Sequence, residues 1–275
     1  MAHEVITSIQ NPLVKRLNQL LDRKGREEQG RFLVEGAHLV EEALKSGAEV
    51  MTILYDNDRD MDPACRRAMA NHPGDVHVVA ASAAVLGKLS ETKSPQGIVA
   101  EVTKIATDWA DWVDKKMSAD EDLLLLFLDE IQDPGNLGTI LRTAEAASVD
   151  GVVLGKGSVD VYNGKVVRAT MGALFRLPVF TGALPETAAQ WRRNGGRLLV
   201  SSLQKDSIAY DEADYTKRTA IVIGNEGRGV CEDLMRQADQ YVHIPIYGQA
   251  ESLNAAVAAG IFVYEAQRKR KDQLR

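Results

Sequence analysis

Asn136 and Arg142 bring an amide and a guanidinium group to an expected helix that follows the apolar run 123–128. Asp133 and Pro134 form the turn between strand and helix, because both residue types favour turns. Amide and guanidinium groups donate hydrogen bonds to hydroxyl and phosphate oxygens, so this segment suits a polar ligand. By itself the pattern is equally consistent with an ordinary turn and a surface arginine.

A second segment, residues 221–229, places Glu226 among three glycines that follow another apolar strand. Glycine lets a ligand approach the backbone closely because it has no side chain. Glu226 adds a carboxylate beside that surface. Glycine-rich turns are often only structural, so this segment alone does not identify a site.

A third segment, residues 244–260, begins where Pro245 ends a strand. Ser252 or Asn254 caps the helix that follows, and the small residues of that helix permit close packing. Unpaired backbone amides at a helix start donate hydrogen bonds to a ligand. A plain capped helix explains the same residues equally well.

Each segment lies just beyond a strand in an alternating series of strands and helices. Such alternation predicts a parallel sheet with helices on both faces, and these sheets bind ligands at the carboxyl ends of their strands. The three segments therefore belong to one edge of one sheet. We expect strands at 123–128, 151–154, 179–181, 197–202, 219–224 and 240–244, and helices at 137–147, 166–173, 186–193, 231–237 and 253–268.

The N-terminal third shows a shorter series of the same kind and predicts a small α/β domain. Residues 108–122 then carry Trp109, Trp112 and many charged residues, which is typical of a linker or a solvated connecting helix. We predict an N-terminal domain over 1–105, a linker over 106–121 and a C-terminal domain over 122–275. In the first domain we expect strands at 32–35, 50–55, 76–80 and 98–102, and helices at 38–44, 63–70 and 82–89.

The composition of the 275-residue chain is that of a folded protein, since hydrophobic residues make up 45% of it. The formal net charge of −6 gives no overall indication of nucleic-acid binding, so an RNA-binding surface has to be local. Two distant cysteines, Cys65 and Cys231, argue against a disulfide framework and fit a reducing cytoplasm. We expect a cytoplasmic protein, since the N-terminus has no signal pattern and the longest apolar run is too short to span a membrane.

Taken together, the three segments resemble the motifs of the SpoU or TrmH family of the SPOUT methyltransferase superfamily. The resemblance covers residues 122–275 and is specific, because these motifs rarely occur together by chance. The motifs are Asn-Leu-Gly from Asn136 with Arg142 after it, Gly-Asn-Glu-Gly from Gly224, and Ile-Pro from Ile244 with Ser-Leu-Asn from Ser252.

The N-terminal third is similar to the substrate-binding domain of that family, which resembles ribosomal protein L30e. The similarity consists of Asn-Pro-x-Val-Lys at 11–15, Phe-Leu-Val-Glu-Gly at 32–36 and Ser-Pro-Gln-Gly-Ile at 94–98. The resemblance therefore spans nearly the full chain. It implies that the N-terminal domain binds structured RNA.

This resemblance implies an enzyme that uses S-adenosylmethionine to methylate a ribose 2′-hydroxyl in RNA, without a metal. It also implies a deep trefoil knot in the C-terminal domain and a homodimer formed through that domain. The residues expected to contact the cofactor are Gly224, Ile244, Leu253 and Ser202. The residues expected to act in catalysis are Arg142, Asn136, Glu226, Ser252 and Asn254.

An arginine guanidinium stays protonated in proteins, and this makes Arg142 a poor general base. We expect Arg142 to orient the ribose and an adjacent phosphate and to stabilise negative charge on the reacting oxygen. A neighbouring group or water then accepts the proton.

Residues 11–31 carry six basic residues against three acidic ones, and phosphate contacts dominate RNA affinity. We expect this stretch to contact RNA, although a solvated helix face explains it equally well without the family resemblance. The basic run 268–271 is typical of a solubilising tail. The candidate RNA-binding residues are Lys15, Arg16, Arg23, Lys24 and Arg26.

The resemblance favours large-subunit (23S) ribosomal RNA as the substrate, with transfer RNA as the second candidate. A non-enzymatic alternative is an RNA-binding ribosome-assembly factor that has lost catalysis, and the retained catalytic set argues against it. The sequence does not support a nucleotide hydrolase, because it lacks the phosphate-binding motif of that class. It does not support a dinucleotide-binding dehydrogenase either, because the glycines of 224–229 do not have the required spacing. The five histidines form no close ligand pair, which disfavours metal catalysis.

Overall fold

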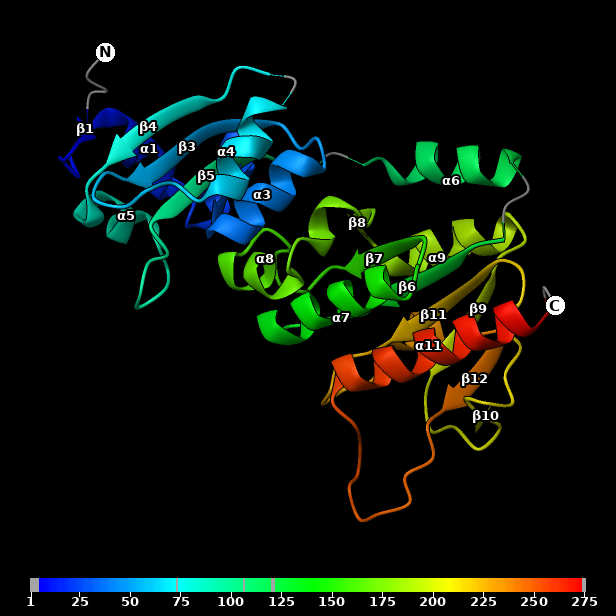
Figure 1. Ribbon diagram of the computed structural model, residues 1–275. Coiled ribbons are helices and arrows are strands. Elements are labelled where there is room, and N and C mark those ends of the chain that lie inside the picture. Colours follow the sequence, from blue (N-terminus) through cyan, green and yellow to red (C-terminus); the bar gives the residue numbers. More distant parts are fainter. Residues whose placement is uncertain (1–4, 73, 106, 120–121, 274–275) are drawn as a thin grey trace. The chain divides into compact units, whose positions relative to one another are not determined.

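The computed structural model describes residues 5–72, 74–105, 107–119 and 122–273, which form two compact units (Figure 1). The first unit contains the described residues up to 105 together with Asp160–Arg176. The second contains the described residues of Thr107–Val159 and Leu177–Arg275. Residues 106, 120 and 121 of the predicted linker lie outside the described part, as do the chain ends 1–4 and 274–275.

The first unit is built on a five-stranded mixed sheet in the order β1-β4-β3-β5-β2. Strand β3 pairs parallel with β4 and antiparallel with β5, and β5 also pairs antiparallel with β2. The four predicted strands are all present, and the two-residue β1 was not predicted. The strands are β1 (Val5–Ile6), β2 (Arg31–Glu35), β3 (Val50–Asp56), β4 (His77–Ala81) and β5 (Ile98–Thr103).

The helices of the first unit begin at capping residues that the sequence identifies. The Ser82 side chain accepts from the Val85 amide, and Asp62 caps the helix that Pro63 starts. The two helices nearest the N-terminus lie in the basic stretch 11–31, where no helix bounds were predicted. The helices are α1 (Pro12–Gln19), α2 (Arg23–Gln29), α3 (Ala37–Lys45), α4 (Pro63–Ala70) and α5 (Ala83–Leu89).

The segment Asp160–Arg176 packs in the first unit, although the sequence assigned it to the C-terminal domain. It contains α8 (Gly164–Thr170) and the short 3-10 helix η1 (Ala173–Phe175), and α8 lies against β2. Val166 and Val167 of α8 are buried there. The helix prediction is confirmed, but the position of the segment in the chain does not show which unit buries its apolar side.

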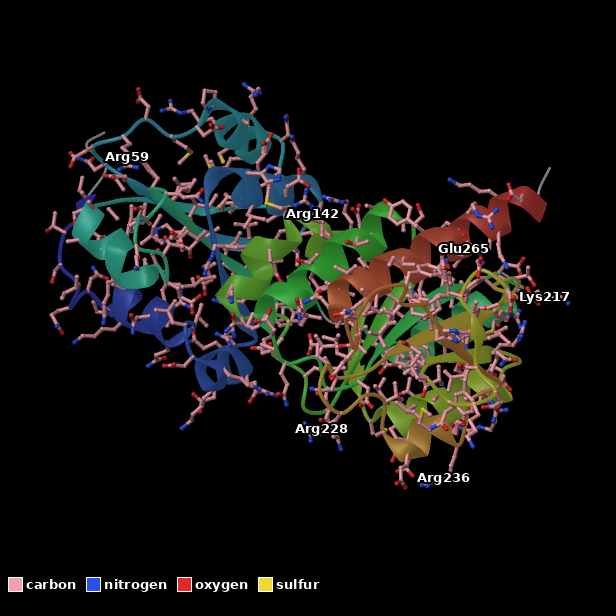
Figure 2. All side chains as sticks on the ribbon, turned by 90° about the horizontal axis from the view of Figure 1, so that it is seen from below. Arg59, Arg142, Lys217, Arg228, Arg236 and Glu265 are labelled. Atoms are coloured by element: carbon pink, nitrogen blue, oxygen red, sulfur yellow. The ribbon has the colours of Figure 1, made fainter. Side chains whose placement is uncertain are left out.

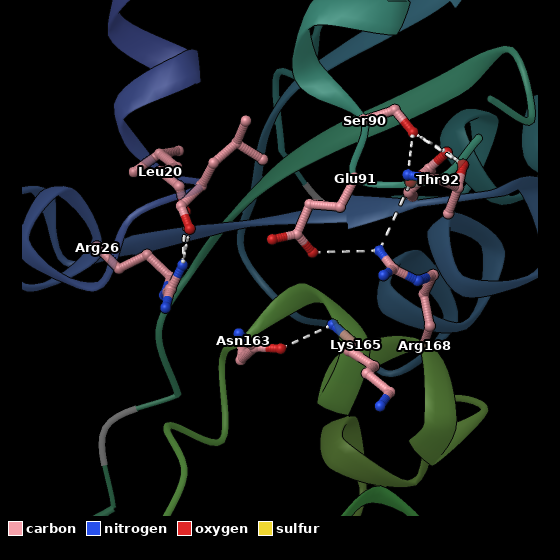
Figure 3. Close-up of polar contacts among 10 residues, drawn as sticks. Leu20, Arg26, Ser90, Glu91, Thr92, Asn163, Lys165 and Arg168 are labelled. Atoms are coloured by element: carbon pink, nitrogen blue, oxygen red, sulfur yellow. Dashed lines mark hydrogen bonds and ion pairs between the residues drawn. The ribbon is translucent and has the colours of Figure 1, made fainter. Parts of the chain in front are cut away.

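Ion pairs hold this segment in the first unit (Figure 3). Arg26 lies 2.7 Å from Asp160, and its guanidinium also donates to the Leu20 carbonyl at 2.9 Å. Arg168 lies between the carboxylates of Glu35 and Glu91, at 3.6 and 3.5 Å. These contacts join residues that are distant in sequence, so local periodicity does not predict them.

The second unit is built on seven parallel strands in the order β10-β12-β9-β11-β6-β7-β8, which confirms the predicted parallel sheet. All five residues of β6 are buried, as expected for a strand covered on both faces. The two-residue edge strand β10 was not predicted. The strands are β6 (Leu124–Leu128), β7 (Gly151–Gly155), β8 (Val179–Gly182), β9 (Arg197–Ser201), β10 (Ile208–Ala209), β11 (Thr219–Ile223) and β12 (Gln240–His243).

Helices cover both faces of this sheet. α7 (Pro134–Ala146) and α11 (Ala255–Gln273) lie side by side on one face (Figure 1). α6 (Trp109–Ser118), α9 (Leu184–Arg193) and α10 (Glu232–Met235) contribute to a core cluster on the other. Within the described part of the chain, no helix combines the length and apolar character needed to cross a bilayer.

Helix α6 belongs to the core of the second unit and is not a solvated linker. Val113 is fully buried, and Trp109 and Trp112 pack against the same cluster. The Trp109 ring meets Phe180 edge-on at 5.2 Å, and its indole N–H donates to Gln190 at 3.1 Å. The predicted helix is present, but two tryptophans bury it against the sheet despite its charged outer side.

Glu101 of β5 is a fully buried carboxylate in the first unit. It accepts hydrogen bonds from Arg16, from Arg31 at 2.8 Å and from Thr52 at 2.9 Å. Burial by itself raises the pKa of Glu101, but these hydrogen bonds outweigh it and lower the pKa from 4.5 to about 2. The carboxylate therefore stays charged inside the sheet.

We predict that Glu101→Gln destabilises the first unit by about 3 kcal/mol at neutral pH, because Arg16 and Arg31 lose their buried counter-charge. The folded pKa lies below the unfolded one, so this stabilisation is present above pH 4.5 and is lost as the pH falls toward about 2. Urea unfolding, followed by hydrogen-exchange mass spectrometry of the β2 and β5 peptides, measures it. A difference between wild type and variant that does not shrink on acidification would contradict this assignment.

Candidate active site

A cavity of about 650 Å³ lies at the carboxyl ends of three neighbouring strands of the second unit. Ser201, Ile223 and His243 line it as the last residues of β9, β11 and β12, and Ser202 and Gly224 line it just beyond β9 and β11. In a parallel sheet these ends point the same way, so their loops meet around one space. The cavity is therefore where the strand pattern predicts a ligand site.

All four residues expected to contact a cofactor line this cavity, namely Gly224, Ile244, Leu253 and Ser202. Glu226 and Ser252 of the expected catalytic set line it as well. Other lining residues were not singled out from the sequence, because ordinary apolar and aromatic positions carry no motif. They include Leu203, Met235, Tyr241, His243 and Phe262.

Asn225 shapes the loop between β11 and α10, and it was not among the predicted site residues. Its backbone pairs with Gly229, with N–O distances of 3.0 and 2.8 Å. Its side-chain oxygen accepts from the Gly227 and Arg228 amides at 2.9 and 3.1 Å, while its amide nitrogen donates to the Glu130 carbonyl at 3.0 Å. An asparagine in a glycine-rich turn is the signal that points to this role.

Glycine is required at position 224 because the backbone of Gly229 and Val230 passes close to it. A Cβ atom at Gly224 would lie 2.3 Å from the Gly229 carbonyl carbon and 2.5 Å from the Val230 nitrogen. Backbone atoms cannot move aside as a flexible side chain can. The glycine therefore has a structural reason that needs no ligand.

Two acidic residues after β6 hold the same loop in place. The Asp129 carboxylate accepts from the Cys231 amide at 2.8 Å. Glu130 pairs with Arg228 at 2.5 Å and has a positive φ of 53°, which is uncommon for a residue with a side chain. The loops after β6 and β11 are thus joined at Arg228 and Cys231 as well as at Asn225.

Asn136 connects all three predicted segments. Its side-chain nitrogen donates to Glu226, and its side-chain oxygen accepts from the Asn254 amide nitrogen at 2.9 Å. Asn254 in turn accepts from the Ala256 amide at 2.9 Å and so caps α11, which decides between the two expected caps. The structure brings Asn136, Glu226 and Asn254 together as one polar network.

Arg142 is separate from this network. Its side chain is exposed on α7, and no described residue pairs with it; Figure 2 labels its position. Asn136 and Arg142 are six positions apart, which places them about 120° apart around the helix. Ser252 is exposed at the cavity. Within one chain, the guanidinium therefore does not face Asn136.

The five candidate RNA-binding residues have different environments in the first unit. Lys15, Arg23 and Lys24 are exposed, and Arg23 pairs with Glu27 at 2.7 Å. Arg16 is bound to Glu101. Arg26 is buried in its ion pair with Asp160, so its expected availability to RNA is wrong.

The basic run 268–271 forms the last turns of α11 and is not a free tail. Lys269 donates to the Ala213 carbonyl at 2.8 Å, and Arg270 donates to the Lys217 carbonyl at 3.0 Å. Arg268 pairs with Glu265 at 2.7 Å. Among the described residues, no cluster of three or more histidine, cysteine or acidic side chains has the arrangement of a metal site.

Comparison with known families finds two matches in this chain. Residues 123–264 match a model described as the SpoU rRNA Methylase family. Residues 11–100 match a model described as the MRM3-like substrate binding domain.

Curated relatives align with nearly the whole chain. The 23S rRNA (guanosine(2553)-2′-O)-methyltransferase RlmP of Bacillus subtilis is 37% identical over 94% of this chain and 97% of its own length. The 23S rRNA (uridine(2479)-2′-O)-methyltransferase of Streptomyces viridochromogenes is 32% identical over 90% of this chain and 86% of its own length.

Solved structures of RNA methyltransferases also align with nearly the whole chain. The AdoMet-bound rRNA methyltransferase from Sinorhizobium meliloti is 31% identical, with a TM-score of 0.83 over 97% of this chain and 98% of that one. The SpoU methyltransferase AviRb from Streptomyces viridochromogenes in complex with AdoMet is 31% identical, with a TM-score of 0.82 over 94% and 98%.

We predict that Gly224→Ala opens the 225–229 loop and destabilises the second unit by about 2 kcal/mol, because the added methyl group overlaps backbone. Tryptophan fluorescence during urea unfolding reports this, since all three tryptophans of the chain lie in the second unit. Gly227→Ala is the matched control, because its Cβ would meet only Asn225 Oδ1, at 3.5 Å. Equal stability of the two variants would show that the loop is not packed as described.

Proposed function

The chain belongs to the SpoU rRNA methylase family, and on that premise we propose that it transfers the methyl group of S-adenosylmethionine to a ribose 2′-hydroxyl of RNA. The observation that carries the proposal is the convergence of the three motif segments on one cavity and one polar network. Mapping 2′-O-methyl groups in total RNA from cells with and without the gene tests it. An unchanged methylation map would contradict it.

The cavity fits S-adenosylmethionine in size and in chemistry. Its volume of about 650 Å³ lies in the range of small-molecule sites. Ile244, Leu253 and Phe262 supply apolar surface for an adenine ring, while the loops after β9 and β11 bring backbone groups to the lining. When bound, the cofactor supplies an electrophilic methyl group.

The polar network and Arg142 have different roles in the reaction. The network holds the three segments in fixed positions through Asn136, Glu226 and Asn254. It thereby orients the two reactants, which lowers the entropic part of the activation barrier. Arg142 binds the ribose and a phosphate and stabilises negative charge on the 2′-oxygen as its proton leaves. We do not assign proton acceptance to Arg142, because arginine side chains stay protonated in proteins.

We propose that the enzyme acts as a homodimer and that Arg142 completes the site of the partner subunit. Arg142 faces away from Asn136 in its own chain and has no partner among the described residues. Val257 and Tyr264 of α11 are 52% and 55% exposed, so this helix offers apolar surface for a second copy.

We predict that Arg142→Lys lowers the methylation rate about tenfold to a hundredfold and leaves cofactor affinity unchanged, because lysine keeps the charge and loses the planar fork. Rates with ribosomal RNA from cells that lack the gene, and calorimetry with S-adenosylmethionine, measure the two quantities. Arg193→Lys, at another exposed arginine of the second unit, is the control.

Mixed dimers extend this test to the proposed sharing of sites. A dimer of one Arg142→Lys chain and one Gly224→Ala chain contains one intact site only if Arg142 acts across the interface. Recovered activity is therefore expected in the mixture. No recovery, with mixing shown by native mass spectrometry, would place Arg142 in the site of its own chain.

We propose large-subunit ribosomal RNA as the substrate and the cytoplasm as the compartment. The support is that relatives aligned over nearly the whole chain are named as 23S rRNA methyltransferases, and that residues 11–100 match a substrate-binding domain. The first unit then captures the RNA, and the second performs the reaction. The trefoil knot of the family is expected in the second unit.

We predict that Arg23→Glu together with Lys24→Glu weakens RNA binding and lowers its salt dependence, because phosphate contacts release counterions. Filter binding at several salt concentrations measures both, and calorimetry with S-adenosylmethionine checks that the second unit is intact. The reversal Glu27→Lys with Glu28→Lys, on the same helix, is expected to strengthen binding. If all of these variants bind RNA equally, α2 does not contact the substrate.

A further inference from the structure

Five charged side chains line the cavity, and four of them already have partners. Glu226 accepts from Asn136, Arg228 pairs with Glu130 at 2.5 Å, and Glu232 pairs with Arg236 at 3.2 Å. Arg228 and Arg236 also point outward into solvent, with side chains 67% and 66% exposed (Figure 2). Opposite charges therefore balance Arg228, Arg236 and Glu232, whereas the Glu226 carboxylate is hydrogen-bonded by the neutral amide of Asn136.

Glu251 is the fifth charged residue of the lining, and no described residue forms an ion pair or hydrogen bond with its carboxylate. It lies on the loop between β12 and α11, which extends away from the sheet (Figure 1). Ile246 and Ser252, on either side of it along this loop, also line the cavity. The carboxylate is thus an unbalanced negative charge at the edge of the site.

A carboxylate only accepts hydrogen bonds, so its natural partner is a cation that donates them. S-adenosylmethionine has such a group, the α-ammonium of its methionyl end. The sulfonium is also cationic but has no hydrogen to donate. Charge and hydrogen-bonding capacity together select the ammonium.

We propose that Glu251 binds the α-ammonium group of S-adenosylmethionine and thereby positions the methionyl end of the cofactor. This inference rests on the proposed function, since it needs the cofactor in this cavity. Glu251 lines the same cavity as Glu226 of the polar network and lies three positions before Asn254 on the same loop. Glu251 is a positioning residue that selects ligands with an amino-acid tail.

Calorimetric titration of the full-length protein with three compounds tests the proposal. S-adenosylmethionine and S-adenosylhomocysteine both carry the α-ammonium, whereas 5′-methylthioadenosine lacks the whole amino-acid tail. We expect Glu251→Gln to weaken binding of the first two by about threefold to fivefold, as for an exposed ion pair, and to leave the third unchanged. The loss shrinks in concentrated salt, because salt screens the pair.

Two further variants keep the test specific. Glu251→Asp retains the charge and is expected to recover part of the lost affinity. Glu212→Gln removes an exposed carboxylate of the second unit that does not line the cavity, and it leaves all three affinities unchanged.

Three results would overturn the inference: unchanged binding of all compounds, equal weakening of 5′-methylthioadenosine, or weakening of S-adenosylmethionine alone. The last result would place the carboxylate at the sulfonium. If the wild-type protein binds none of the compounds, the proposed function fails as well. If wild type binds S-adenosylmethionine and Glu251→Gln changes nothing, only the role of Glu251 is wrong.

Discussion

The side-chain amide of Asn136 is the interaction on which the site depends, because it contacts the loops after β11 and β12 at once. An amide carries both a donor and an acceptor, and here each is used toward a different segment. Glu226 and Asn254 come from the other two segments, so the network exists only when all three strands end at the same edge. A parallel sheet meets that requirement, since its strands all point the same way.

The loops around the cavity are held by short backbone contacts as much as by side chains. Asn225 pairs with Gly229, Gly224 leaves room for that pairing, and Asp129 accepts from the Cys231 amide. Because of these contacts the loop is ordered before a ligand binds, so binding costs less conformational entropy. A preformed cavity of this kind is typical of small-molecule and cofactor sites.

Buried charges stabilise the first unit through ion pairs. Glu101 is neutralised by Arg16 and Arg31, and Arg26 is neutralised by Asp160. Two of the basic residues that the charge count assigned to RNA therefore stabilise the fold. The number of basic residues in a segment does not show which of their side chains are exposed to solvent.

The sequence by itself determined the two α/β series, the parallel sheet of the second unit and the three segments at its edge, because periodicity and turn chemistry are local properties. It did not show that residues 160–176 pack in the first unit, that α6 is buried, or that Arg26 is covered. Each of these depends on contacts between residues far apart in the chain, which local patterns do not encode. Only the tertiary structure decided which of the candidate residues meet: Asn136, Glu226 and Asn254 form one network, whereas Arg142 faces away from it.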